Sequence, residues 1–287
     1  MALVFAIFAT ALTVGATTTW YLKYRVKSTI QEYVHDLVKH FELPEKVSYH
    51  NYEYSNQKLF LYQLCSNVTY TNYNDEELPV PTNFELTQTI STMTPKGLSE
   101  NLAMIFYHRE TKITYIIFSG SATKHMWLKD VSCQLVNVDL VIDFENPVMV
   151  HKGFQELYGC TRNIIMNTVE DWLHDITDKY VIAGHSLGGA LATLCAYDLN
   201  TFLHKPINVC TFGSPRVGNV PFAEVYGKLT NITTHRIFNT EDVVPNLPLP
   251  APMLHYTHVG DLVPFTKNLE NVVENHTTAY EEFLENS

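Results

Sequence analysis

A serine flanked by glycines is the feature of this sequence best suited to chemistry. Gly184, Ser186 and Gly188 form the pattern G-x-S-x-G, between a short apolar run and an Ala- and Leu-rich run at helical spacing. This order predicts a strand, a sharp turn and a helix, with the serine hydroxyl exposed as a nucleophile. The backbone N–H of Leu187, at the start of that helix, would face an oxyanion forming on a substrate. The alternative is a serine that only caps an ordinary helix.

Further blocks of sequence extend this pattern and resemble a known family. In the same order along the chain, five blocks are similar to the class 3 (fungal-lipase-like) family of α/β-hydrolases. The similarity covers about residues 84 to 284. The blocks are IIFSGSATKHMWLKD (116–130), VHKGF (150–154), GHSLGGALA (184–192), FGSPRVGN (212–219) and NTEDVVPNLP (239–248).

The resemblance implies an α/β-hydrolase fold, with a mostly parallel central sheet flanked by helices. The hydrophobic patterning agrees, because strand-like and helix-like runs alternate with no linker or repeat after about residue 30. We therefore expect one domain over residues 28–287, built on a single open sheet. Periodicity predicts strands over 85–92, 102–108, 112–118, 133–144, 207–212 and 234–238, and helices over 27–41, 55–73, 154–176 and 277–284.

The same resemblance implies a catalytic acid after the nucleophile in the chain. α/β-Hydrolases carry their triad in the order serine, acid, histidine. Asp242 fits because it follows a predicted strand and precedes the rigid apolar run Val243-Val244-Pro245. Glu241 is the alternative acid, and we expect its side chain to face solvent.

Three histidines downstream of Asp242 are candidates for the general base. His255 and His258 lie on opposite sides of a short β-like stretch and are expected to be structural. His276 resembles the catalytic histidine of the family, at the start of a C-terminal helix. His276 lies 34 positions after Asp242, which leaves room for a strand pair, so we expect His276 on the loop after that pair and within reach of Ser186.

The segment after the third predicted strand carries the remaining expected site elements. By resemblance, Ser121 is the second oxyanion donor; the alternative is an ordinary turn serine. Met126, Trp127 and Leu128 interrupt an otherwise polar run. In the family this segment is a lid that covers the site in water and opens on lipid. The alternative is a short fixed helix in which Trp127 is a core anchor.

Together these residues predict a serine carboxylic-ester hydrolase for lipids, most simply for acylglycerols, working through an acyl-enzyme and without cofactor or metal. A phospholipase A1 or a lipid transacylase could use the same triad. A different class of function is a catalytically silent, membrane-tethered binding module. The expected partners are the lipid ester and a lipid or membrane interface, and protein partners stay undefined.

The net charge and the N-terminal residues indicate where the protein acts. A formal charge of −11 opposes binding to nucleic acid. Met1–Leu22 contains no charged residue and is followed by Lys23, Arg25 and Lys27. This pattern predicts a membrane anchor with the catalytic domain on the cytoplasmic side. The alternative is a cleaved signal peptide and a secreted protein.

Overall fold

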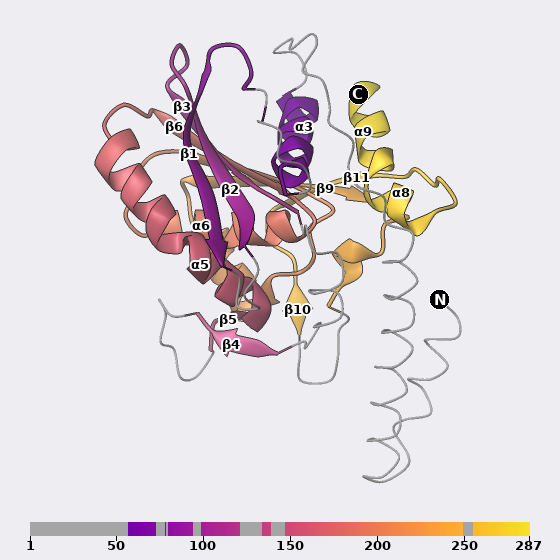
Figure 1. The fold of residues 1–287 in the computed structure, drawn as a ribbon. Coiled ribbons are helices and arrows are strands. Elements are labelled where there is room, and N and C mark those ends of the chain that lie inside the picture. The colour runs from indigo at the N-terminus through magenta and orange to yellow at the C-terminus, as the bar shows by residue number, and fades with distance from the viewer. Residues whose placement is uncertain are drawn as a thin grey trace. The chain divides into compact units, whose positions relative to one another are not determined.

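A seven-stranded sheet organises the computed structural model of this chain (Figure 1). The structure describes residues 57–72, 78, 80–93, 99–120, 134–138, 147–248 and 255–287, and these all fall within one compact unit. The strand order is β1-β2-β3-β6-β7-β9-β11. The strands are β1 (Phe84–Met93), β2 (Ser99–His108), β3 (Ile113–Phe118), β6 (Lys179–His185), β7 (Ile207–Phe212), β9 (Ile232–Asn239) and β11 (Asp261–Phe265).

Most of this sheet is parallel. β1, β2 and β3 pair antiparallel, with β2 and β3 joined by a turn at residues 109–112. From β3 onward, each neighbouring pair through β6, β7, β9 and β11 is parallel. The predicted α/β class with a mostly parallel central sheet is therefore confirmed. Because β6, β7, β9 and β11 run in the same direction, their carboxyl ends meet at one edge of the sheet, where such sheets bind ligands.

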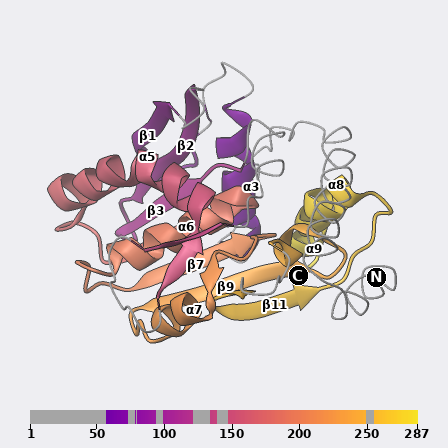
Figure 2. The same cartoon turned by 90° about the horizontal axis from the view of Figure 1, so that it is seen from below.

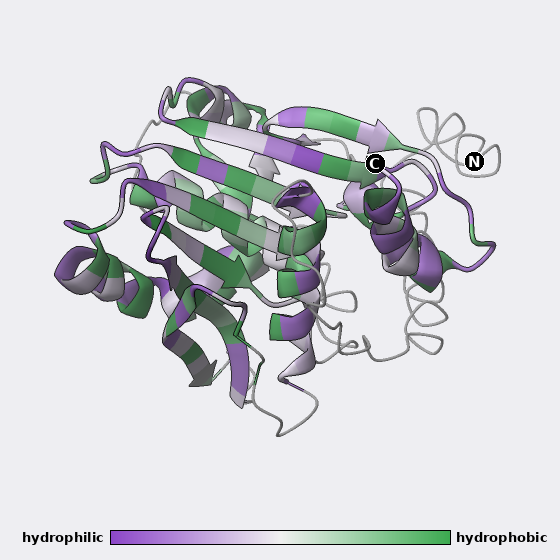
Figure 3. Cartoon of the chain, turned by 90° about the horizontal axis from the view of Figure 1, so that it is seen from above, coloured by the Kyte–Doolittle hydropathy of each residue, from purple (hydrophilic) through white to green (hydrophobic). Residues whose placement is uncertain are grey.

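Helices cover both faces of the sheet (Figure 2). The helix α6 (Leu187–Leu199) follows β6 and packs, with α5 (Lys152–Thr168), on one face. The helices α3 (Gln57–Tyr70) and α9 (Thr278–Glu285) pack against each other on the opposite face. Successive residues of a strand point to opposite faces, so both faces of a central strand must be apolar. Apolar segments accordingly run along the central strands (Figure 3).

A second, smaller sheet was not predicted. Its order is β10-β8-β5-β4, and all of its pairings are antiparallel. The expected single sheet is thus wrong, and the strand predicted over 133–144 is described only as the three residues of β4. Strands of two or three residues leave no periodic pattern in a sequence. The members are β4 (Leu135–Asn137), β5 (Met149–His151), β8 (Gly218–Asn219) and β10 (Tyr256–Thr257).

His151 links the small sheet to α5. It is the last residue of β5 and the N-cap of the helix. Its Nδ1 accepts a hydrogen bond of 3.4 Å from the N–H of Phe154 in the first turn of α5. Burial lowers the pKa of His151 to about 4, so the ring stays neutral and able to accept this bond. After α5 the helix continues for one π-helical turn, η2 (Val169–Leu173), so the predicted helix to residue 176 ends slightly early.

The C-terminal part differs in detail from the expectation. The two strands between Asp242 and His276 do not pair, because β10 joins the small sheet and β11 joins the large one. The unpredicted short helix α8 (Val272–His276) precedes α9, so His276 ends one helix just before the next begins. The fold also contains α7 (Val220–Gly227) and the 3₁₀ turn η3 (Val244–Asn246).

Several predictions lie outside the described residues. They concern the anchor at 1–22, the helix over 27–41, the oxyanion donor Ser121 and the lid segment 122–130. In the part of the chain that is described, no helix has both the length and the apolar character needed to cross a membrane.

Candidate active site

Ser186 occupies a strained turn between β6 and α6. Its backbone has φ 56° and ψ −126°, a region that residues with a side chain rarely adopt. The N–H of Ser186 donates to the carbonyl of Phe212 at the end of β7, 2.8 Å away. Although Ser186 precedes α6, its hydroxyl makes no capping bond to the helix. The capping alternative is therefore wrong, and the hydroxyl is left for another partner.

The glycines on either side allow this turn to be tight. A Cβ on Gly184 would lie 2.1 Å from the carbonyl carbon and oxygen of Gly188. A Cβ on Gly188 would lie 2.7 Å from the carbonyl oxygens of Phe118 and Ser119. All of these neighbours are backbone atoms, which cannot rotate away. The pattern G-x-S-x-G thus reflects steric exclusion at both flanking positions, which holds the start of α6 against the ends of β6 and β3.

The start of α6 presents backbone donors beside the serine. Leu187 is its first residue, and the first N–H groups of a helix have no acceptor within the helix. Gly120, the last described residue before Ser121, lies next to the same turn, because a Cβ on it would be 3.6 Å from the carbonyl oxygen of His185. The described chain before Ser121 therefore ends, at Gly120, next to the nucleophile turn.

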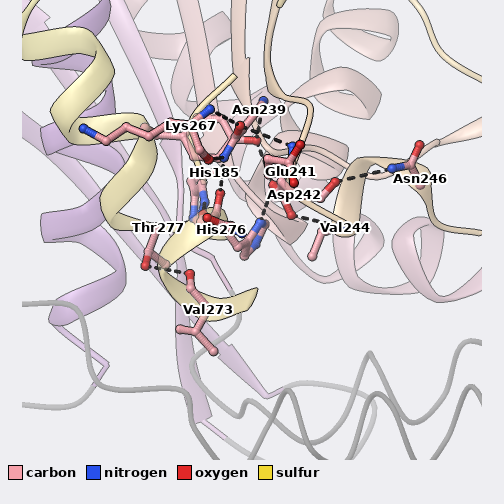
Figure 4. A network of polar contacts seen from close by, with 12 residues as sticks. His185, Asn239, Glu241, Asp242, Val244, Asn246, Lys267, Val273, His276 and Thr277 are labelled. Carbon is pink, nitrogen blue, oxygen red and sulfur yellow. Dashed lines mark hydrogen bonds and ion pairs between the residues drawn. The ribbon is translucent and has the colours of Figure 1, made fainter. Parts of the chain in front are cut away.

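Asp242 and His276 form a buried pair at the same edge of the sheet (Figure 4). The Nδ1 of His276 lies 2.7 Å from Oδ2 of Asp242, and each residue is only 1% exposed. Oδ2 also accepts a bond of 2.7 Å from the hydroxyl of Tyr280, and Oδ1 accepts one of 3.0 Å from the N–H of Val244. Three donors thus compensate the carboxylate for the water it has lost.

These bonds define which nitrogen of His276 is available. An ionised carboxylate only accepts, so Nδ1 of a neutral His276 carries its proton and Nε2 keeps its lone pair. Within the described part of the chain, Nε2 is buried and has no hydrogen-bond partner. A buried nitrogen lone pair without a donor is costly. It is therefore suited to accept a proton from a hydroxyl brought to it.

Two contacts place the ring of His276 next to the nucleophile turn. A Cβ on Gly213 would lie 3.0 Å from both Oδ2 of Asp242 and Cε1 of His276, and Gly213 follows the residue that accepts the N–H of Ser186. On the other side, the ring of His185 lies 4.6 Å from the ring of His276. The Nε2 of His185 donates to the carbonyl of His276 over 2.6 Å. The Asp242–His276 pair thus lies next to Gly213, and His276 contacts His185, the residue before Ser186.

Comparison with known proteins agrees with this arrangement. The sequence model of the class 3 lipases matches residues 115–252. A lipase of Rhizomucor miehei is 35% identical over 183 residues, covering 60% of this chain and 47% of that protein. The chloroplastic phospholipase A(1) DAD1 of Arabidopsis thaliana is 34% identical over 149 residues, covering 46% of this chain and 33% of that protein.

A solved triacylglycerol lipase, whose catalytic centre is described as a serine protease triad, is 32% identical with a TM-score of 0.56. The match covers 65% of this chain and 68% of that one. The chain belongs to the class 3 lipase family. It spans less than half the length of the two curated relatives above.

Sequence reasoning missed two residues that hold the acid and histidine segments of this class 3 lipase together. Asn239 is buried at the end of β9, and its Nδ2 donates to the carbonyls of Lys267 and Asn275, each 2.9 Å away. Tyr280, which donates to Asp242, also accepts the N–H of Asn239. Burial and the charge of Asp242 hold the pKa of Tyr280 well above its usual value, so the hydroxyl stays a donor. Asn239 lies in the family-like block 239–248 and Tyr280 in the predicted C-terminal helix, but only the fold shows their hydrogen-bond partners.

The alternative candidates lie elsewhere in the lipase fold. Glu241 is exposed, as expected. His255 is exposed too, whereas His258 is partly buried and donates from Nε2 to the carbonyl of Pro245, 2.8 Å away. Burial, and then the charge of Arg236, lower the pKa of His258 to about 3, so its ring is neutral. Arg216 donates to the carbonyl of Pro248 over 2.9 Å, so its side chain has a local hydrogen-bonding role.

The crowding at the nucleophile turn leads to a stability prediction. Gly184→Ala should lower the free energy of unfolding by roughly 1–3 kcal/mol, because the added methyl overlaps backbone atoms of Gly188. Thermal unfolding followed by circular dichroism would measure the change. Gly159→Ala is the matched control: this exposed glycine of α5 has no atom within 4 Å of its missing Cβ, so the change should be neutral or slightly stabilising. Equal unfolding midpoints for both variants would contradict the steric account.

Proposed function

We propose that this class 3 lipase hydrolyses carboxylic esters of lipids through an acyl-enzyme on Ser186. The observation that carries the proposal is the buried Asp242–His276 pair, which lies beside the strained serine turn with Nε2 of His276 unpartnered among the described residues. A general base, its orienting acid and a nucleophile are the parts that acyl transfer requires. No described group of His, Cys, Asp and Glu side chains suggests a metal.

In this mechanism Nε2 of His276 takes the hydroxyl proton as Ser186 Oγ attacks the ester carbonyl. The N–H groups of Leu187 and Ser121 stabilise the oxyanion of the tetrahedral intermediate. His276 then gives its proton to the leaving alcohol, and the C–O bond to that alcohol breaks. Water attacks the acyl-enzyme by the same steps in reverse, releasing the fatty acid and restoring Ser186. Asp242 holds the Nδ1 tautomer and stabilises the imidazolium throughout.

The names of the relatives support two candidate substrate classes. An acylglycerol is our first choice, because related proteins include lipases of Rhizomucor miehei and Rhizopus oryzae and a solved triacylglycerol lipase. Phospholipases A1 of Oryza sativa and Arabidopsis thaliana are also related, so a phospholipid is the second candidate. A transacylase would use the same acyl-enzyme and deliver the acyl group to a second alcohol instead of water.

A silent binding module is the less favourable reading. Its fold would not need a non-glycine residue at positive φ, which costs about 1–3 kcal/mol. Nor would it need to bury a histidine nitrogen without a partner. Strain and an unsatisfied group in the same place favour a site retained for chemistry.

The first test of this function combines the nucleophile with a substrate panel. Ser186→Ala should lower turnover by at least about 10⁴-fold and abolish covalent labelling by an organophosphonate, because the acyl-enzyme is proposed to form on this hydroxyl. The full-length protein would be assayed on short-chain esters, triacylglycerol, diacylglycerol and phospholipid. Undiminished hydrolysis by Ser186→Ala would contradict the enzyme assignment. The preferred member of the panel would separate a lipase from a phospholipase A1.

The base assignment is tested by comparing histidines. His276→Ala should lower kcat by several orders of magnitude, since the hydroxyl then stays a poor nucleophile. His258→Ala should instead lower the free energy of unfolding by about 1–3 kcal/mol, because the carbonyl of Pro245 loses its donor, and should keep near-normal kcat. The opposite result, an inactive but stable His258→Ala beside an active His276→Ala, would move the base to His258.

We also propose that Met1–Leu22 tethers the lipase domain to a membrane, with the domain on the cytoplasmic side. The support is the uncharged 22-residue stretch and the basic residues that follow it. In sealed vesicles of the endoplasmic reticulum, externally added protease should digest the domain. Protection of the domain, or a chain shortened at its N-terminus, would favour the alternative of a secreted protein.

A further inference from the structure

The helix α3 precedes the residues that the family model matches, and the sequence assigned it no role. Tyr62 and Thr69 are seven residues apart, so they lie on the same side of α3, two turns from each other. Both side chains are buried, at 4% and 9% exposure. Each makes a hydrogen bond to the backbone of a segment that carries a proposed catalytic group.

Tyr62 contacts the segment of the base. Its hydroxyl donates to the carbonyl of Thr277, 2.8 Å away, and His185 donates to the preceding carbonyl, that of His276. These carbonyls lie where α8 ends, and terminal carbonyls of a helix have no donor within the helix. Burial holds the pKa of Tyr62 above its usual value, so its hydroxyl remains a donor. Side chains from α3 and β6 therefore fix the backbone on which the His276 ring is mounted.

The ring of Tyr62 adds contacts to the same group. It lies edge-on to the ring of His185, with centroids 5.6 Å apart, and stacks on the ring of Tyr280 at 6.1 Å. Tyr280 is the residue that donates to Asp242. The aromatic body of Tyr62 thus touches both residues that bond the Asp242–His276 pair, while its hydroxyl bonds the next carbonyl. Phenylalanine at this position would keep the ring contacts and remove the hydroxyl that donates to Thr277.

Thr69 contacts the opposite side of the site. Its Oγ1 donates to the carbonyl of Cys65 over 2.8 Å and accepts the N–H of Gly120 over 2.7 Å. Because the hydroxyl proton is used within the helix, the oxygen lone pair faces Gly120. Gly120 leads directly into Ser121, the proposed second oxyanion donor. A threonine of α3 therefore fixes the entrance of the oxyanion loop.

We propose that α3 is a positioning helix, which sets the proposed base through Tyr62 and the proposed oxyanion loop through Thr69. The inference rests on the proposed function, since it assigns roles relative to that triad. Neither side chain touches the reacting atoms; each acts through the backbone it holds. A misplacement of about 1 Å at a catalytic group can cost about 10²-fold in rate. Loss of either bond should therefore lower kcat more than it changes KM.

The variants separate positioning from stability. Tyr62→Phe and Thr69→Val each remove one hydroxyl with little change of shape, and Thr69→Ser restores the hydroxyl. Tyr226→Phe is the control for the first, because Tyr226 is a buried tyrosine of α7 whose hydroxyl bonds Thr234. Thr161→Val is the control for the second, because Thr161 is a buried threonine of α5 that donates to the carbonyl of Tyr158.

The kinetic readout uses the full-length protein with p-nitrophenyl butyrate, alongside the thermal unfolding midpoint. Tyr62→Phe and Thr69→Val should lower kcat by about 10-fold or more and leave KM within about twofold. Thr69→Ser should recover most of the loss. The two controls should lower the unfolding midpoint by a similar amount and keep kcat. If Tyr62→Phe and Thr69→Val lose stability like the controls but retain kcat, α3 is a structural helix only.

A second readout is independent of turnover. The Nδ1 proton of His276, held against Asp242, is expected as a low-field proton NMR signal. Tyr62→Phe should shift or broaden this signal and Tyr226→Phe should leave it unchanged. If the wild-type protein hydrolyses no ester while the signal responds as expected, the proposed function fails and the positioning of His276 by α3 stands. If the wild-type protein is active and neither kcat nor the signal responds, the α3 proposal fails and the hydrolase function stands.

Discussion

The backbone conformation of Ser186 is the constraint on which the other parts of the site depend. At φ 56° a residue with a side chain is about 1–3 kcal/mol above its relaxed state, and only its surroundings can hold it there. Those surroundings are backbone groups: the carbonyl of Phe212 that accepts its N–H, and the tight packing at Gly184 and Gly188. The ends of the parallel strands β3, β6 and β7 and the start of α6 thus hold Ser186 in this conformation.

The parallel direction of β9 and β11 explains why the acid and the histidine meet there. Asp242 follows β9, and the chain returns along β11, whose last residue Phe265 pairs with Asn239. Since the strands run the same way, the segment after β11 leaves the sheet at the edge where β9 ends. Asn239 then bonds the backbone at Lys267 and Asn275, which leaves His276 beside Asp242. An antiparallel last strand would have carried the histidine segment to the far edge.

Sequence alone predicts the parts of this structure that depend on local patterns. The central strands show because they are short, nearly continuous apolar runs, and the serine turn shows because steric exclusion restricts Gly184 and Gly188 to glycine. The small sheet has strands of two or three residues, too short for any period. The bond between Tyr62 and Thr277 joins residues 215 positions apart, so no local pattern can indicate it. Contacts within one local pattern could be predicted from the sequence, whereas contacts between residues far apart in the chain could not.

The three downstream histidines show how burial, and not residue type, assigns a role. His258 and His276 are both imidazoles within reach of backbone and polar groups, so residue type alone does not distinguish them. In the fold, His258 donates from its Nε2 to a carbonyl, so the nitrogen that a base needs is already engaged. His276 uses Nδ1 toward a carboxylate, and its Nε2 has no partner among the described residues. The same ring is structural when its bond fixes a loop and becomes a candidate base when its bond frees the opposite nitrogen. The backbone around His276 is itself hydrogen-bonded, because the carbonyls of His276 and Thr277 accept from side chains of β6 and α3.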